Sequence, residues 1–318
     1  RAGVALAEIV SKPDLRTGRE AAEYASEIRR IMRYLGVSDG NMQEGSLRCD
    51  VNISVRRGPD APFGTKVEIK NMNSFSAIQK AVDYEIKRQV KAYEAGEPVV
   101  QETRLWDEGK QLTKSMRSKE GASDYRYFPD PDLGPIEVSA EQQEGWRSEL
   151  PELPAAKRHR YADDLGLSQY DARVLTDERQ MADYFEAVVT AGADAKLSAN
   201  WITGDLAAYV NSNRLSFAAL PFRPEQLSEM VQLIDGGKIS GKIAKEILPE
   251  LLEKGGSPKA IVDERGLGMI SDPAAIEAIV DELLGAHPEE DEAFRGGKTK
   301  LQGFFVGQLM KKTGGKAD

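Results

Sequence analysis

Two short stretches of the sequence alternate charged and apolar side chains, and these charged groups are the ones best suited to chemistry. Residues 48–56 alternate strictly, with Asp50 in the polar phase, and residues 66–70 repeat the pattern with Glu68 and Lys70 in the polar phase. Such alternation predicts β-strands whose polar side chains share one face. Two carboxylates at neighbouring depth can hold Mg²⁺, and a lysine beside them suits an anionic phosphate. The alternative is a solvent-exposed sheet face with ordinary charge pairs.

Two other residues stand out beside these stretches. Glu8 is the one carboxylate within residues 4–10, whose apolar and β-branched content predicts a strand. An acid buried in such a strand would need a partner, such as a metal ion or a base. Asn71 follows the second alternating stretch, and its poor strand propensity indicates that something other than propensity places it there.

Basic and aromatic side chains are interleaved over residues 102–128, which include Arg104 and Arg126. Guanidinium groups suit phosphates and aromatic rings suit bases, so this stretch is a candidate for contact with a nucleotide or an RNA end. An ordinary charged hairpin is the alternative.

Two apparent motifs are interpreted as structural. Residues 236–242 fit the first seven positions of a phosphate-binding P-loop, but Ile243 stands where a serine or threonine would contact Mg²⁺. A helix rather than a strand is expected before the motif, so the segment is predicted to be a helix–helix turn. Cys49 lies in the apolar phase of its strand, has no evident histidine partner, and is predicted to be a core residue rather than a nucleophile.

Length and composition limit the class of protein. A chain of 318 residues suggests about two domains, and 40% hydrophobic and 30% charged residues exclude wholesale disorder. No apolar run approaches the ~18 residues of a membrane span. The single cysteine excludes an internal disulfide and a cysteine-rich zinc site and favours the reducing cytosol, and the presence of only two histidines argues against a multi-histidine metal site. The net charge of −9 argues against non-specific coating of nucleic acid.

The elements that must position the charged groups follow from periodicity. Apolar residues recur from Ala21 to Leu35 and predict a helix that Gly36 ends. Ser74 can cap a second helix with an apolar stripe from Phe75 to Tyr93. A second hairpin is predicted over 99–106 and 111–117. After the proline cluster at 151–154, helices are predicted over 155–165, 180–192, 198–211, 224–235, 240–253, 273–285 and 298–312.

The predicted fold class is therefore α+β. A mixed α/β domain with antiparallel strands is expected over residues 1–150, an all-α domain over 151–265, and a small helical tail domain over 266–318.

Charge reverses sharply in the tail. Residues 281–294 contain six acids and no lysine or arginine, whereas residues 295–318 contain six lysines or arginines and one acid. Such a reversal marks either an interaction tail or a solvated helix end. The lysines expected to contact phosphates are Lys298, Lys300, Lys311 and Lys312. The apolar stripe expected on the opposite side of their helix consists of Leu301, Phe304, Phe305 and Leu309.

Longer runs of residues resemble a known family along nearly the whole chain. The matching runs are EIVSKPD (8–14), GSLRCDVNIS (45–54), FGTKVEIKNMNSF (63–75), QETR (101–104), DYRYFP (124–129), ISGKIAK (239–245) and GFFVGQLMK (303–311). The sequence is similar to the B-type subunit, or GatB family, of the bacterial aspartyl-tRNA(Asn)/glutamyl-tRNA(Gln) amidotransferases. In these runs it looks like a piece of a GatB protein, without the family's first strand region and the last helix of its tail.

The resemblance implies a cradle domain with a kinase-like site, a helical domain, and a small YqeY-like tail that grips tRNA. It implies ATP- and Mg²⁺-dependent phosphorylation of the side-chain carboxyl of glutamate or aspartate mischarged onto tRNA. Ammonia from the A-type subunit, a glutaminase, then gives the amide, and the C-type subunit straps the A-type and B-type subunits together. A cytoplasmic enzyme is implied, with no membrane partner.

The resemblance also implies roles for individual residues. The expected metal ligands are Glu8, Asp50 and Glu68, and the expected catalytic groups are Asp50, Glu68 and Lys70. The expected phosphate or carboxylate contacts are Asn71, Arg104 and Arg126. Two alternatives stay open: a non-catalytic RNA-binding adaptor protein, and a purely structural partner of an amidase.

Overall fold

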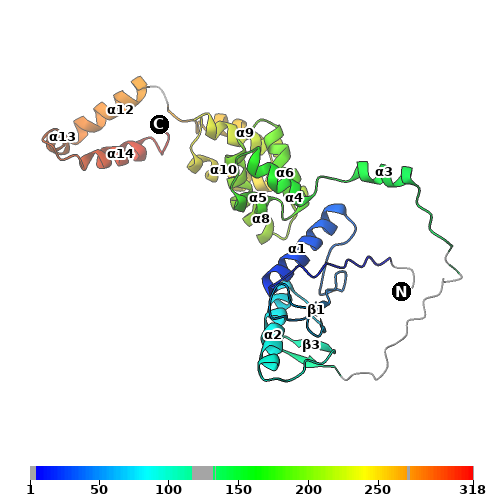
Figure 1. Ribbon diagram of the computed structural model, residues 1–318. Coiled ribbons are helices and arrows are strands. Elements are labelled where there is room, and N and C mark those ends of the chain that lie inside the picture. The colour runs from blue at the N-terminus through cyan, green and yellow to red at the C-terminus, as the bar shows by residue number, and fades with distance from the viewer. Residues whose placement is uncertain (1–4, 117–131, 133, 271–272, 318) are drawn as a thin grey trace. The chain divides into compact units, whose positions relative to one another are not determined.

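The computed structural model describes residues 5–116, 132, 134–270 and 273–317, and the chain divides into two compact units, residues 1–153 and 154–318 (Figure 1). Each unit is built around its own hydrophobic cluster. The α+β class predicted from the sequence is confirmed, because a four-stranded sheet occurs together with many helices.

The sheet of the first unit has the strand order β1-β2-β3-β4. Its strands are β1 (Val51–Ile53), β2 (Val67–Lys70), β3 (Thr103–Asp107) and β4 (Leu112–Ser115). The predicted antiparallel pairs β1–β2 and β3–β4 are confirmed, but the central pair β2–β3 is parallel. The long helix between β2 and β3 explains this, since parallel neighbours need a crossover connection rather than a hairpin.

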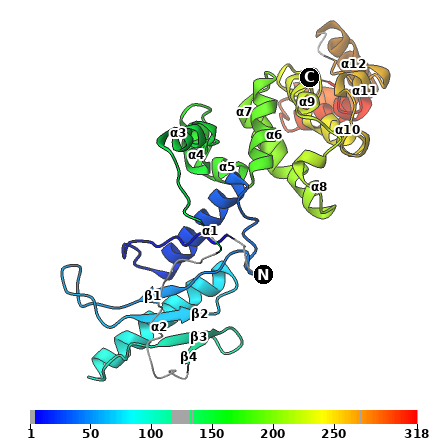
Figure 2. The ribbon, with the colours of Figure 1, turned by 90° about the vertical axis from the view of Figure 1, so that its right-hand side faces the viewer.

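Two helices pack beside the sheet (Figure 2). Helix α1 (Gly18–Leu35) begins with a capping box of Thr17 and Glu20 and ends at Gly36, whose φ of 68° is the left-handed conformation that glycine adopts readily. Helix α2 (Phe75–Glu94) begins at Ser74, whose hydroxyl accepts a hydrogen bond from the Ala77 amide. α2 contacts β1 and β4, and α1 packs against α2.

One predicted strand is wrong. Residues 5–10 have no regular structure and are exposed throughout, with Leu6 92% exposed. A strand is stable only when a neighbour satisfies its backbone hydrogen bonds, and the described part of the chain pairs no strand with this segment. Apolar, β-branched composition was therefore insufficient here. The strand predicted over 48–56 is also shorter, since only Val51–Ile53 pair.

Helix α3 (Ala140–Glu149) ends the first unit, and the described part of the second unit is helical apart from one isolated bridge. Its elements are α4 (Pro154–Asp163), α5 (Gln169–Leu175), α6 (Arg179–Thr190), α7 (Ala195–Trp201), the π-helical turn η1 (Ile202–Leu206), α8 (Ala207–Ser212), the 3₁₀ turn η2 (Phe217–Ala219), α9 (Pro224–Asp235), α10 (Gly241–Lys254), α11 (Pro258–Glu264), α12 (Pro273–Ala286), α13 (Pro288–Arg295) and α14 (Leu301–Lys312). Helices α3, α5, α11 and α13, of seven to ten residues, were not predicted. Short helices give too few turns for periodicity to emerge.

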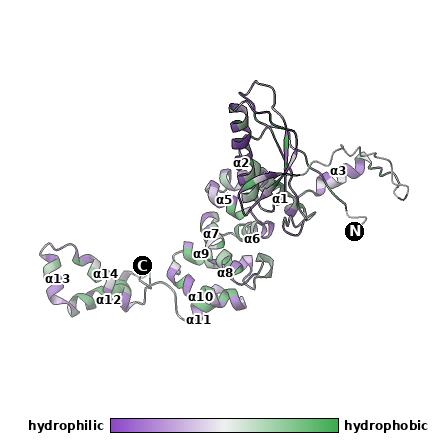
Figure 3. Ribbon diagram, turned by 90° about the horizontal axis from the view of Figure 1, so that it is seen from below, coloured by the Kyte–Doolittle hydropathy of each residue, from purple (hydrophilic) through white to green (hydrophobic). Residues whose placement is uncertain are grey.

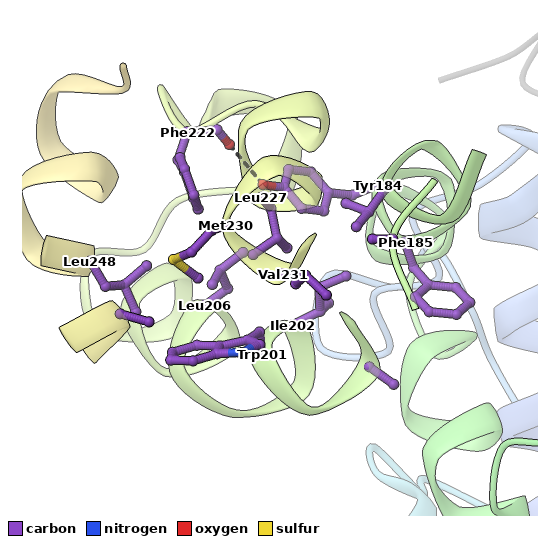
Figure 4. Packing of buried hydrophobic residues seen from close by; sticks show 14 of the residues in the cluster. Tyr184, Phe185, Trp201, Ile202, Leu206, Phe222, Leu227, Met230, Val231 and Leu248 are labelled. Atoms are coloured by element: carbon purple, nitrogen blue, oxygen red, sulfur yellow. Dashed lines mark hydrogen bonds between the residues drawn. The ribbon is translucent and has the colours of Figure 1, made fainter. Parts of the chain in front are cut away.

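The core of the second unit is formed by apolar residues from α4 to α11, and Figure 4 labels those between α6 and α10. Phe185, Ile202 and Leu227 are fully buried, and the Tyr184 hydroxyl donates a hydrogen bond to the Phe222 carbonyl oxygen at 2.8 Å. Hydrophobic and hydrophilic residues share the same helices, as expected for helices that bury one side (Figure 3). Among the described residues, no helix is long and apolar enough to cross a membrane.

Candidate active site

Strand register sorts the side chains of the sheet onto two faces. Val67 and Ile69 of β2 are buried, and they alternate with Glu68 and Lys70, which are half-buried. The face that carries Glu68 and Lys70 is called the open face below. Asn52 of β1 pairs with Glu68 of β2 and lies on the same face. Asp50, two residues before Asn52, therefore also lies on the open face.

The open face brings Asp50 and Glu68 together through Lys70. The Lys70 ammonium lies 3.1 Å from Asp50 Oδ2 and 3.4 Å from Glu68 Oε1. Asp50 Oδ2 and Glu68 Oε1 are therefore no farther apart than the sum of these two distances. The hydrogen bond to Asp50 is the main cause that raises the pKa of Lys70, so the ammonium form is favoured. Side-chain exposures of 31–50% leave all three groups accessible to a ligand.

Thr103 adds a contact that sequence reasoning missed. Its hydroxyl donates a hydrogen bond to Glu68 Oε2 at 2.8 Å, and the Glu68 amide donates to the Glu102 carbonyl oxygen at 3.1 Å. Thr103 is the parallel-strand partner of Glu68. Only the register of β2 with β3 reveals this contact, and no local pattern in the sequence carries it.

Asn71 ends β2 in the left-handed conformation, with φ of 71°. Its amide nitrogen donates to the Trp106 carbonyl oxygen at 3.1 Å. Asparagine tolerates this conformation better than other non-glycine residues, which accounts for its presence directly after a strand. The side chain thus ties the end of β2 to β3.

Arg104 belongs to the opposite face of the sheet, since it pairs with buried Ile69. Its guanidinium donates to the Thr113 hydroxyl and carbonyl oxygens, each at 2.8 Å, and it also bonds Glu102. With its side chain 13% exposed, Arg104 is occupied by contacts within the protein. The structure therefore does not bring it to Asp50 and Glu68.

A buried carboxylate, Glu85 of α2, organises this opposite face. Its side chain is fully buried and accepts hydrogen bonds from Arg88 at 2.6–3.1 Å, from Gln89 Nε2 at 3.0 Å and from the Thr113 hydroxyl at 3.0 Å. Arg104 Nε lies 3.7 Å from the same carboxylate. Sequence reasoning did not single out Glu85, because one acid in the middle of an amphipathic helix gives no local sign of burial.

Glu8 is not gathered with the other two predicted metal ligands. It is exposed within the irregular residues 5–10, and no group of three or more histidine, cysteine, aspartate or glutamate side chains among the described residues is arranged to hold a metal ion. Two carboxylates still suit Mg²⁺, which is commonly held by one or two of them together with water and phosphate oxygens. Asp50 and Glu68 meet this requirement, and the cation that bridges them is an ammonium.

The other sequence predictions can now be located. Arg126 lies outside the described residues. Cys49 packs against the first core, where burial raises the pKa of its thiol, as expected for a core residue. The turn predicted at 236–242 is confirmed, because α9 ends at Asp235 and α10 begins at Gly241.

In the tail, the predicted stripe and lysines lie on α14 and on the turn before it. Leu301, Phe304, Phe305 and Leu309 are half-buried. The Phe304 ring contacts that of Phe305 edge-to-face, with centroids 5.4 Å apart. Lys298, Lys300, Lys311 and Lys312 are exposed, and Lys312 pairs with Glu282 of α12.

Comparison with known proteins connects both parts of the chain to one family. The model of the GatB/GatE catalytic domain matches residues 1–144, and that of the GatB domain matches residues 183–318. Over all 318 residues the chain is 98% identical to the B-type subunit of the aspartyl/glutamyl-tRNA(Asn/Gln) amidotransferase of Synechococcus sp. (strain CC9902), and it covers 64% of that protein. It is 87% identical, over 64% of the relative's length, to the protein of the same name from Prochlorococcus marinus (strain MIT 9303).

The chain thus spans just under two thirds of the length of these curated relatives. The first family model lies within the first unit and the second within the second unit, and residues 145–182 lie between the two matches. This agreement along the whole sequence shows that the chain belongs to the GatB family.

Proposed function

We propose that this chain is part of a tRNA-dependent amidotransferase that uses ATP and Mg²⁺ to phosphorylate the side-chain carboxyl of glutamate on tRNA(Gln), of aspartate on tRNA(Asn), or of both. It would work in the cytoplasm with an A-type glutaminase subunit and a smaller C-type subunit. The observation that carries the proposal is the convergence of Asp50, Glu68 and Lys70 on the open face, in a chain of this family.

Phosphorylation is needed because a carboxylate is a poor electrophile. An oxygen of the substrate carboxylate attacks the γ-phosphorus of ATP, the bond to the ADP oxygen breaks, and an acyl phosphate results. Ammonia then attacks the acyl carbon, the bond from that carbon to the phosphate oxygen breaks, phosphate leaves with the bonding electrons and takes up one proton from the nitrogen, and the amide remains. Both steps conserve atoms and charge without a redox partner.

The chain's own residues would act by position and charge. Asp50 and Glu68 would hold Mg²⁺, which neutralises charge on the transferred phosphoryl group when it is bound. Lys70, next to both carboxylates, would contact a phosphate oxygen. Thr103 would keep Glu68 in place, because its hydroxyl holds the carboxylate oxygen that Lys70 does not contact.

The test uses the full-length protein reconstituted with its partner subunits and both mischarged tRNAs. Asp50→Asn and Glu68→Gln should abolish carboxyl phosphorylation and amide formation, while glutaminase assembly stays intact. Asp107→Asn is the matched control, because Asp107 also pairs with a lysine, Lys114, on the same sheet. Its activity should stay within twofold of the original.

Two results would favour the alternatives. Binding of tRNA without any ATP hydrolysis stimulated by mischarged tRNA would indicate an adaptor. Formation of the amidase complex without any binding of ATP would indicate a purely structural partner. Unchanged amide formation in Asp50→Asn and Glu68→Gln would show that these two residues do not form the active site.

A further inference from the structure

The Lys70 ammonium occupies the position between two carboxylates that a divalent cation would need. Its nitrogen contacts one oxygen of Asp50 at 3.1 Å and one oxygen of Glu68 at 3.4 Å. Oxygen ligands lie ~2.1 Å from Mg²⁺. A metal ion bound to both oxygens would place its charge close to the Lys70 ammonium, so the two cations compete for this pair of oxygens.

Glu68 has a second anchor that does not depend on Lys70. Its other oxygen accepts a hydrogen bond from the Thr103 hydroxyl at 2.8 Å, and its backbone amide is bonded within the sheet. When Lys70 moves away, Glu68 keeps its place. Asp50 differs, since Lys70 is the one side chain bonded to its carboxylate among the described residues.

Lys70 is able to move. Its side chain is 40% exposed, so no packed shell holds it, and its four-carbon stem is flexible. A divalent ion between the carboxylates would repel the ammonium, which would then swing toward solvent or toward a nearby anion. On the open face that anion would be a phosphate of the nucleotide.

We propose that Lys70 is a built-in counter-ion, which holds Asp50 and Glu68 together before a divalent cation binds and is displaced toward the phosphates when the cation arrives. The second half of this statement rests on the proposed function. The first half needs only the geometry of the three side chains. Lys70 thus keeps two like charges close together in the metal-free protein and competes with the metal for them.

The competition predicts the direction in which the affinity for a divalent cation changes, and the measurement does not require catalytic activity. Mn²⁺ binding to the full chain is measured by electron paramagnetic resonance, which reports the free ion, without nucleotide. Lys70→Met removes the competing charge at similar side-chain volume, so Mn²⁺ should bind about 3- to 10-fold more tightly. Lys70→Arg keeps a cation between the carboxylates and should restore the weaker binding. Asp50→Asn should weaken binding at least tenfold.

Lys114→Met is the matched control, because Lys114 pairs with a carboxylate, that of Asp107, on the same sheet but not with Asp50 or Glu68. Its Mn²⁺ affinity should equal that of the original chain. Thermal melting of each variant checks folding, and Lys70→Gln provides a second neutral replacement.

The possible results separate the two ideas. Mn²⁺ binding that is equal to or weaker than that of the original chain in both Lys70→Met and Lys70→Gln, and that still depends on Asp50, would contradict the counter-ion role of Lys70. The proposed metal site would remain valid. The absence of any Asp50-dependent binding in every variant would overturn the metal site and the counter-ion together. Tighter binding in both neutral variants, reversed in Lys70→Arg, would support the proposal.

Discussion

Replacing Glu85 with alanine tests how the first unit is held together. The Glu85 carboxylate is fully buried and accepts bonds from Arg88, Gln89 and Thr113, with Arg104 nearby. Removing one partner of a buried ion pair typically costs ~3–5 kcal/mol, because the other charge is left uncompensated. Arg88 is 26% exposed and can be hydrated, and Arg104 keeps its bond to Glu102. We therefore expect a loss near the lower end, ~3 kcal/mol.

The assay is native-state hydrogen exchange of the backbone amides of Glu68 and Ile69 in the central strand β2, which reports the opening free energy of this sheet without contribution from the second unit. Glu23→Ala is the control, because Glu23 pairs with Arg19 on the exposed side of α1. An exposed pair of this kind contributes less than ~0.5 kcal/mol. If Glu85→Ala and Glu23→Ala changed the exchange equally, the buried network would not stabilise the sheet.

Three further predictions concern other parts of the chain. Burial raises the pKa of Glu186, but hydrogen bonds from Lys157 and Arg160 outweigh burial and hold the pKa below the ordinary 4.5. The ionised Glu186 therefore stabilises the fold above pH 4.5, and this contribution is lost as the pH falls through the lowered pKa. Glu186→Gln should flatten the acid unfolding curve of the second unit, measured by circular dichroism. Gly18→Ala should lower the melting temperature of the first unit, because the added Cβ would clash with the Gln79 carbonyl oxygen of α2, and an equally stable variant would refute this close contact. The double change of Lys311 and Lys312 to alanine should raise the apparent KM for tRNA and flatten its salt dependence by ~0.7–0.9 per lost phosphate contact, with kcat unchanged, whereas an unaltered salt slope would assign these lysines to solvent or to a protein partner.

The parts of the fold that the sequence predicted well are those with strong local signals. Ser74 and Gly36 are a helix cap and a helix end with clear chemistry, and both are found where they were expected. Strict alternation located β2 to within one residue. These features depend on neighbours in the sequence, so periodicity and capping preferences reveal them.

The features that were missed depend on contacts between distant residues. The parallel pairing of β2 with β3, and the bond from Thr103 to Glu68 that follows from it, join segments 35 residues apart. Residues 5–10 carry the composition of a strand but pair with no described strand. A local pattern indicates that a segment can form a strand, but the segment forms one only where a partner strand is available.

The candidate site was predicted in part. Alternation placed Asp50, Glu68 and Lys70 on one polar face, and the structure brings these three side chains into contact. Arg104 was expected near them, but the register puts it on the opposite face, bonded to Thr113. One residue of register separates the two faces of a strand, so a run of charges predicts a site only after its phase is known.

The most direct test of the account is to locate a bound divalent ion relative to the open face. Crystals of the protein soaked in Mn²⁺ would be measured at the manganese absorption edge. The account predicts an anomalous peak ~2.1 Å from one carboxylate oxygen of Asp50 and one of Glu68, with the Lys70 ammonium moved out of its position between them. A manganese peak elsewhere, with Lys70 still bonded to both carboxylates, would contradict it.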